Sequence, residues 1–142
     1  AKNRERAAVN DVDPTVTSWW AGDGFGDSRT ARRELEGVLP GIAEHFAIPK
    51  PIGLIRHILK LVTTPSNGDV VLDCFAGSGT TAHAVLEQNV ADGGDRRFVL
   101  VELEDYADTL TAERVRRVLK GSGGQPHVAT GFDYYELDGP FP

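Results

Sequence analysis

Apolar and polar residues follow one another along this chain in a pattern that predicts strand, helix, strand, helix and strand in turn. Residues 70–72 and 98–101 are short, continuous apolar runs, and each is followed by an acid, as expected of buried strands. Helices are expected over residues 80–90 and 105–120, and alternation over residues 132–137 predicts a last strand. Short links between such elements favour an α/β unit with a parallel sheet and right-handed crossovers.

Two further helices are predicted upstream. Ser28 or Thr30 is expected to cap a helix over residues 31–38. Pro51 can stand in the first turn of the next helix, where apolar residues recur at helical spacing and predict one buried face: Ile55, Ile58, Leu59 and Val62. Residues 1–16 are polar and lack periodicity, so we expect a flexible lead-in there and one structural unit over residues 17–142.

Length and composition limit the possibilities. The chain has 142 residues, 25% charged and 40% hydrophobic, which is typical of one globular domain. No apolar run approaches the roughly 20 residues of a membrane-spanning helix, so no membrane association is expected. The single cysteine, Cys74, excludes an internal disulfide and fits a reducing compartment, so we expect a cytoplasmic location. The net charge of −6 argues against this chain being a nucleic-acid-binding surface by itself, and the absence of methionine predicts an excerpt of a longer protein.

The small-residue loop between the first predicted strand and the helix after it is the candidate for ligand binding. A phosphate-binding P-loop is excluded because Thr80, not lysine, follows Gly79. A dinucleotide-binding unit of the NAD type stays open, since Gly77-x-Gly79-x-x-Ala82 fits that fingerprint and Glu102 lies at the expected ribose-binding distance in sequence. Asp73, however, would repel a pyrophosphate. It suits a cationic group, such as the amino group of S-adenosylmethionine, unless it only caps the following helix.

Several segments together resemble the amino-group DNA methyltransferases. Residues 73–81 (Asp-Cys-Phe-Ala-Gly-Ser-Gly-Thr-Thr) are similar to the S-adenosylmethionine loop of that family. Lys50-Pro51 with the helix after it resembles the segment before this loop in the circularly permuted, beta-class members, and residues 96–103 resemble their second strand. Residues 18–20 and 131–137 are similar to flanking parts of type III modification subunits. The resemblance implies a partial Rossmann-like S-adenosylmethionine-dependent methyltransferase fold.

The resemblance also implies roles for particular residues. Asp73 and the loop backbone would hold the methionyl part, Lys50 and Pro51 would line its other side, and Glu102 would bind the ribose hydroxyls, with Glu104 and Asp105 as rivals for that role. The implied cofactor-binding set is Lys50, Pro51, Asp73, Phe75, Ala76, Gly77, Ser78, Gly79, Thr80 and Glu102.

The family's catalytic signature is not found. It consists of an acid or amide, two prolines and an aromatic residue that stacks on a flipped base. Residues 13–16 lack the second proline and the aromatic residue, and residues 138–141 lie at the wrong end of the chain. We therefore assign no catalytic residue. The expected function is the S-adenosylmethionine-binding portion of a site-specific DNA methyltransferase of a restriction–modification system, with adenine N6 favoured over cytosine N4 and the isolated chain inactive.

Partners follow from the same resemblance. DNA would be bound through absent parts of the parent protein, and a restriction subunit is a possible partner. The strand at residue 70 would lack its usual neighbour, so its exposed apolar edge predicts a homodimer or pairing with the missing half. The alternatives are a degenerate fragment that acts only as a protein-interaction module, and a small methyltransferase that is complete as it stands.

The remaining candidates have simpler interpretations. The four histidines lack a metal-ligand spacing, so no metal site is expected. Cys74 is expected to be a packed small residue and His83 a solvated helix position. Trp19 and Trp20 would cover the flank of the sheet or stack on a base. The basic residues near the end of the last helix would complement its dipole or contact phosphate: Arg114, Arg116, Arg117 and Lys120.

Overall fold

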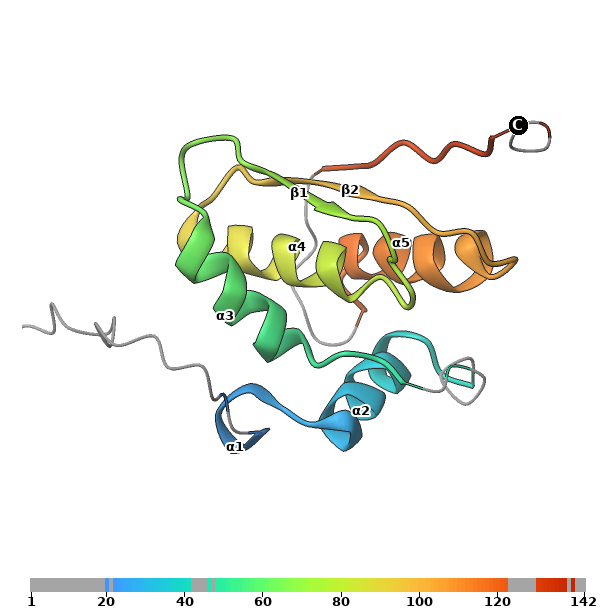
Figure 1. Cartoon of the computed structure of the whole chain (residues 1–142), viewed down its shortest axis with the longest axis horizontal. Helices are drawn as coiled ribbons and strands as arrows, with labels where there is room; N and C mark the ends of the chain where they lie inside the picture. The colour runs from blue at the N-terminus through green and yellow to red at the C-terminus, as the bar shows by residue number, and fades with distance from the viewer. Residues whose placement is uncertain are drawn as a thin grey trace, which may run out of the picture.

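The computed structural model describes residues 20, 22–41, 46, 48–122, 130–137 and 139, so the predicted lead-in lies outside the described residues. Figure 1 shows the order of the elements. They are α1 (Gly22–Phe25), α2 (Ser28–Val38), α3 (Ile52–Val62), β1 (Val70–Asp73), α4 (Thr80–Asp92), β2 (Arg97–Leu100), the π-helix η2 (Ala107–Ala112) and α5 (Glu113–Leu119). None of the described helices has both the length and the apolar character that crossing a membrane requires.

The sheet is parallel, as predicted, and α4 connects its two strands. β1 pairs with β2 in a register that runs from Val70 opposite Arg97 to Asp73 opposite Leu100. The predicted α/β class is therefore confirmed. Because the strands are parallel, both carboxyl ends lie at the same edge of the sheet, as open α/β ligand sites require.

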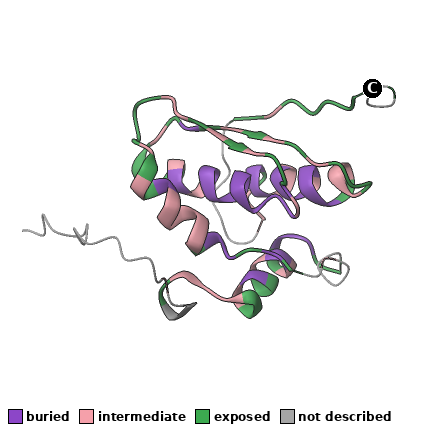
Figure 2. Cartoon of the chain, viewed as in Figure 1, coloured by how far each residue is buried: buried purple, intermediate pink, exposed green. Residues whose placement is uncertain are grey.

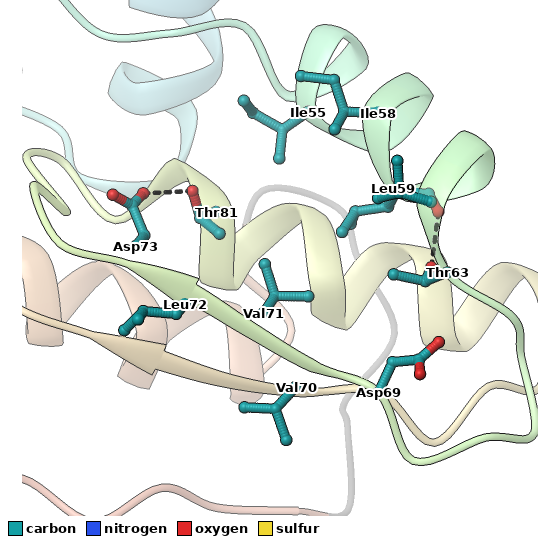
Figure 3. A pocket seen from close by; sticks show the side chains of 11 residues that line it. Ile55, Ile58, Leu59, Thr63, Asp69, Val70, Val71, Leu72, Asp73 and Thr81 are labelled. Carbon is teal, nitrogen blue, oxygen red and sulfur yellow. Dashed lines mark hydrogen bonds between the residues drawn. The ribbon is translucent and has the colours of Figure 1, made fainter.

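The prediction that both strands are buried is wrong for one face of the sheet. Val71 and Phe98 pack on the core that α3 and α4 form, whereas Val70 and Leu72 on the opposite face are 53% and 61% exposed. Figure 3 shows Val71 directed toward α4 and Val70 and Leu72 directed away from it. Alternate side chains of a strand point to opposite faces, and among the described residues only one face is covered by helices.

The predicted last strand is not formed. Residues 130–137 contain no assigned strand, so the described part of the sheet has two strands. Phe132 lies 6.5 Å from Phe98 between ring centroids, and the Arg116 guanidinium lies 5.9 Å from the Phe132 ring centre. The alternation read from the sequence therefore corresponds to a segment attached by aromatic contacts rather than by backbone pairing.

Helix α4 is the centre of the core (Figure 2). It is buried nearly all round, as expected of a helix surrounded by other elements. On one side it packs with residues of α2, η2 and α5, in a cluster that includes Leu35, Leu86 and Val115. On the other side it packs with Leu59 of α3. Two clusters of buried residues therefore flank α4, and Phe98 of β2 packs against both of them.

The N-cap of α2 and the buried face of α3 differ from the predictions made from the sequence. The N-cap of α2 is Asp27, not Ser28 or Thr30, because its carboxylate accepts from the Thr30 backbone N–H at 2.8 Å. That hydrogen bond lowers the pKa of Asp27 to about 2. In α3 the predicted face is only partly buried, since Leu59 is buried while Val62 is 72% exposed.

Candidate cofactor site

The loop between β1 and α4 lies at the carboxyl edge of the sheet, against the segment that follows β2. The Ala76 N–H donates to the Val101 carbonyl at 3.0 Å, and the Val101 N–H donates to the Asp73 carbonyl at 2.9 Å. These bonds hold the loop beside the end of β2. Two acids, Asp73 at the end of β1 and Glu102 just after β2, consequently come to the same edge.

Asp73 is half-buried and hydrogen-bonded within its own loop. Its Oδ1 accepts from the Phe75 N–H at 3.1 Å, and its Oδ2 accepts from the Thr81 hydroxyl at 2.5 Å (Figure 3). Thr81 is in the first turn of α4, so Asp73 is tied to that helix through a side-chain hydroxyl, but it does not cap the helix, whose N-cap, Gly79, has no side-chain cap hydrogen bond. A carboxylate has about four lone-pair sites, and no cationic side chain of the described residues forms an ion pair with Asp73. Capacity to bind a ligand cation therefore remains.

The Glu102 side chain points toward the glycine loop and is hydrogen-bonded to it. Its Oε2 accepts from the Gly77 N–H at 2.7 Å, while its Oε1 accepts from the N–H groups of Leu103 and Glu104 at 2.9 and 3.1 Å. Glu104 and Asp105, the rivals considered for the ribose role, are both exposed. Glu102 is thus the acid of this segment that reaches the loop.

The two loop glycines are required by the packing of the loop itself. Gly77 and Gly79 have φ angles of +52° and +74°, a region that other residues rarely adopt. A Cβ on Gly79 would lie 3.0 Å from the carbonyl oxygen of Thr111 in η2. The Thr111 hydroxyl donates to the Gly77 carbonyl at 2.5 Å. The π-helix therefore supports the loop from behind, which the sequence pattern did not indicate.

The structure brings the Lys50-Pro51 segment to the loop. The Thr80 hydroxyl donates to the Lys50 carbonyl at 3.3 Å, although 30 residues separate them. Lys50 is exposed, whereas Pro51 is buried against Gly26. In the loop itself Phe75 is 87% exposed, and Ala76 and Ser78 are buried. The predicted residues therefore meet in one region.

Three interpretations of residues around the loop are wrong. Arg114, expected to complement the helix dipole or contact phosphate, is fully buried, and its Nη1 donates to the Thr80 hydroxyl at 2.9 Å. His83, expected to be solvated, is only 2% exposed, and burial lowers its pKa. Cys74, expected to be packed, is exposed. The 3.6-residue periodicity of apolar residues predicts one buried face for each helix. Because α4 and α5 pack against other elements on several sides, polar residues of these helices are buried as well.

The other basic and aromatic candidates contact nearby groups of the chain. Arg116 pairs with Asp108 at 2.7 Å, a hydrogen bond that raises the pKa of Arg116, and Arg117 pairs with Glu113 at 2.8 Å. Trp20 lies edge-on to His57 of α3 at 4.9 Å between ring centroids. It therefore rests on a helix rather than on the flank of the sheet. Trp19 and residues 13–16 lie outside the described residues.

An apolar groove runs between α3 and β1, with a volume of about 440 Å³ (Figure 3). Its walls are mainly aliphatic side chains of the two elements, including Ile58, Val62 and Val71, and Asp73 stands at one end. The groove lies along the edge of β1 that does not pair with β2. This explains why Val62 is exposed despite its apolar helical register.

Comparison with known proteins finds relatives that are DNA-modifying enzymes. A family model described as DNA methylase matches residues 1–114. The type III restriction–modification enzyme StyLTI Mod subunit of Salmonella typhimurium is 31% identical over 144 residues, covering 89% of this chain and 21% of the relative. The EcoPI Mod subunit of Escherichia phage P1 is 42% identical over 107 residues, covering 66% of this chain and 16% of the relative.

A type II enzyme is also similar: the methyltransferase M.KpnI of Klebsiella pneumoniae is 44% identical over 57 residues, which cover 40% of this chain and 13% of the relative. The chain spans about a fifth or less of the length of these relatives. The family resemblance read from the loop and its flanking segments is confirmed. This chain belongs to the DNA methylase family, and type III modification subunits are among its relatives.

Proposed function

We propose that this chain is the S-adenosylmethionine-binding part of a site-specific DNA methyltransferase of a restriction–modification system, with adenine N6 as the favoured target. The observation that supports this most is the pair of carboxylates, Asp73 and Glu102, on either side of a glycine loop at the carboxyl ends of two adjacent parallel strands. We further propose that the two-stranded unit is part of a Rossmann-like methyltransferase sheet.

The donor set suits a cationic ligand better than a polyphosphate. Two acids at one edge attract an ammonium or sulfonium group and repel a pyrophosphate. This weighs against the NAD-type alternative, in which the loop would face two phosphates. Asp73 would hold the methionyl amino group, Glu102 would accept from the ribose hydroxyls, and the exposed ring of Phe75 and the Lys50-Pro51 segment would flank the ligand.

The bonds already made within the loop limit what it can offer. The N–H groups of Phe75, Ala76, Gly77 and Gly79 each donate to an acceptor of the chain itself. We therefore assign recognition of the cofactor mainly to the acidic side chains, and assign to the loop backbone the shape of the pocket.

The bound cofactor would supply a sulfonium-activated methyl group. The contribution of this chain is to bind and orient it, since positioning accounts for much of the rate of such transfers. The acceptor would be an exocyclic amino group of a DNA base. The residues that hold the base are assigned to the remainder of a longer protein, as are contacts with DNA and with a restriction subunit. We therefore expect the isolated chain to bind without catalysing.

The proposal is tested by calorimetric titration of the chain with S-adenosylmethionine, with NAD as the ligand control. Asp73→Asn keeps the shape of the side chain and removes its charge, and Asp73→Ala removes both. We expect saturable binding of S-adenosylmethionine, none of NAD, and a loss of at least about tenfold in affinity in both variants, equivalent to about 1.4 kcal/mol.

Two matched variants separate ligand binding from the structural contact of Asp73 with Thr81 in α4. Thr81→Val removes the hydrogen bond to Asp73 and leaves the charge of Asp73. Asp69→Asn makes the same acid-to-amide change as Asp73→Asn, but next to the other end of β1. Both should retain most of the affinity. Equal loss in Thr81→Val and Asp73→Asn would favour a purely structural role for Asp73. A folded chain without any binding would favour the protein-interaction fragment, and methyl transfer to unmethylated duplex DNA above a no-protein control would overturn the binding-only assignment.

A further inference from the structure

Arg114 is the most deeply buried charged residue of the described part of the chain. It is 0% exposed, and it lies in α5 directly behind the glycine loop. Its Nη1 donates to the Ser78 carbonyl at 3.2 Å, to the Ser78 hydroxyl at 3.1 Å and to the Thr80 hydroxyl at 2.9 Å. Its Nε donates to Nδ1 of His83 at 3.2 Å. Most of its hydrogen bonds therefore go to the loop.

The acceptors around Arg114 are neutral, which is unusual for a buried cation. Within the described residues no carboxylate forms an ion pair with it, and its Nη2 has no hydrogen-bond partner. Burial lowers the pKa of Arg114 to about 10, and the more distant carboxylates of Glu34 and Glu87 oppose that shift. A buried cation without a direct counter-ion costs stability compared with a well-packed apolar residue. An arginine at this place therefore calls for a reason other than stability.

The hydrogen bonds continue from Arg114 to the second wall of the pocket. Thr80 accepts from Arg114 and donates to the Lys50 carbonyl at 3.3 Å. Arg114 is thus joined through one hydroxyl to the segment that precedes α3. The first residue of α3, directly after that segment, is held by Glu34, whose carboxylate accepts from the Ile52 N–H at 2.9 Å. The chain of contacts connects the glycine loop with the Lys50-Pro51 segment.

We propose that Arg114 is a positioning residue for the cofactor: through Thr80 it sets the distance between the glycine loop and the Lys50-Pro51 segment, the two walls between which the ligand binds. This inference rests on the proposed function. The planar guanidinium has donors in fixed directions, so it can hold Ser78 and Thr80 in one arrangement where a flexible ammonium could not. A site whose walls are already in place binds without the cost of ordering them.

The experiment measures the affinity of the whole 142-residue chain for S-adenosylmethionine by calorimetry. Thr80→Val removes the contact between the two walls and leaves Arg114 buried. Arg114→Lys retains the charge and removes the fork, and Arg114→Met removes both. Arg117→Met is the matched control, since Arg117 lies in the same helix, is partly exposed, and donates to Glu113 and to the Val38 carbonyl rather than to the loop. Circular dichroism and urea unfolding establish that each variant is folded at the temperature of the titration.

We expect Thr80→Val and Arg114→Lys to bind S-adenosylmethionine at least about tenfold more weakly than the unsubstituted chain does. Arg117→Met should bind it with the same affinity as the unsubstituted chain. The combined variant Thr80→Val/Arg114→Lys should lose little more than either change alone, since both break one pathway. A purely structural role predicts lower stability with unchanged affinity in the folded variants, and that result would overturn the inference alone. No binding by the unsubstituted chain would overturn the proposed function and the inference with it.

Discussion

The requirement for glycine at position 79 gives the sharpest prediction about stability. Its φ angle of +74° lies in the left-handed region, and a Cβ there would lie 3.0 Å from the Thr111 carbonyl oxygen and 3.5 Å from the Thr111 methyl carbon. Gly79→Ala therefore meets two costs. The backbone conformation costs about 1–2 kcal/mol for any residue with a Cβ, and the displaced turn of η2 adds about 1–2 kcal/mol more of overpacking.

Two other glycines supply controls for the first cost alone. Gly68 and Gly93 have φ angles of +63° and +68°, and a Cβ on either would meet no atom within 4 Å. Gly68→Ala and Gly93→Ala should therefore each lower the free energy of unfolding by about 1–2 kcal/mol, and Gly79→Ala by about 2–4 kcal/mol. The difference isolates the contact between the loop and η2.

Urea unfolding followed by circular dichroism measures all three variants. With a slope of about 2 kcal/mol per molar urea, the midpoint should fall by about 0.5–1 M in the two controls and by about 1–2 M in Gly79→Ala. Gly79→Ala should also lose cofactor affinity, since the loop must move away from η2. A midpoint for Gly79→Ala within about 0.2 M of the controls would refute the close approach of the loop to Thr111.

Two further predictions concern protonation and self-association. Burial lowers the pKa of His83 in the folded chain. As the pH falls below about 6.5, this histidine is therefore protonated in the unfolded chain before it is protonated in the folded chain, and the free energy of unfolding decreases as the pH falls further. Between pH 7.5 and 5.5 the free energy of unfolding should fall by about 1 kcal/mol more in the unsubstituted chain than in His83→Gln; equal losses in urea titrations would contradict this. Within the described part of the chain, the face of β1 that carries Val70 and Leu72 is exposed and one edge of β1 is unpaired, which predicts concentration-dependent dimers in sedimentation velocity. Leu72→Lys should weaken these dimers and Val90→Lys on α4 should not, whereas a monodisperse, highly stable monomer would count against the prediction.

Local sequence signals were sufficient for the strand–loop–helix core of this protein. The apolar run before Asp73, the two glycines and the helical register after Thr80 depend on residues close in the chain, and all three appear where they were predicted. The same holds for α3, which begins directly after Pro51. Such features are decided by backbone sterics and by the periodicity of apolar residues. The strand expected over residues 132–137 was not decided in this way, because those residues alternate without pairing with the sheet.

Which residues support the loop was decided by tertiary structure alone. Arg114, Thr111 and Lys50 lie about 30 residues from the loop atoms that they contact, and nothing in their local sequence indicates those contacts. His83 and Arg114 looked like surface positions because helical periodicity identifies one buried face, whereas α4 is covered on several sides. Sequence therefore determined where a ligand loop forms and which acids end the strands. The packing of distant helices determined the shape of that loop, because hydrogen bonds to buried acceptors form only once the elements are assembled.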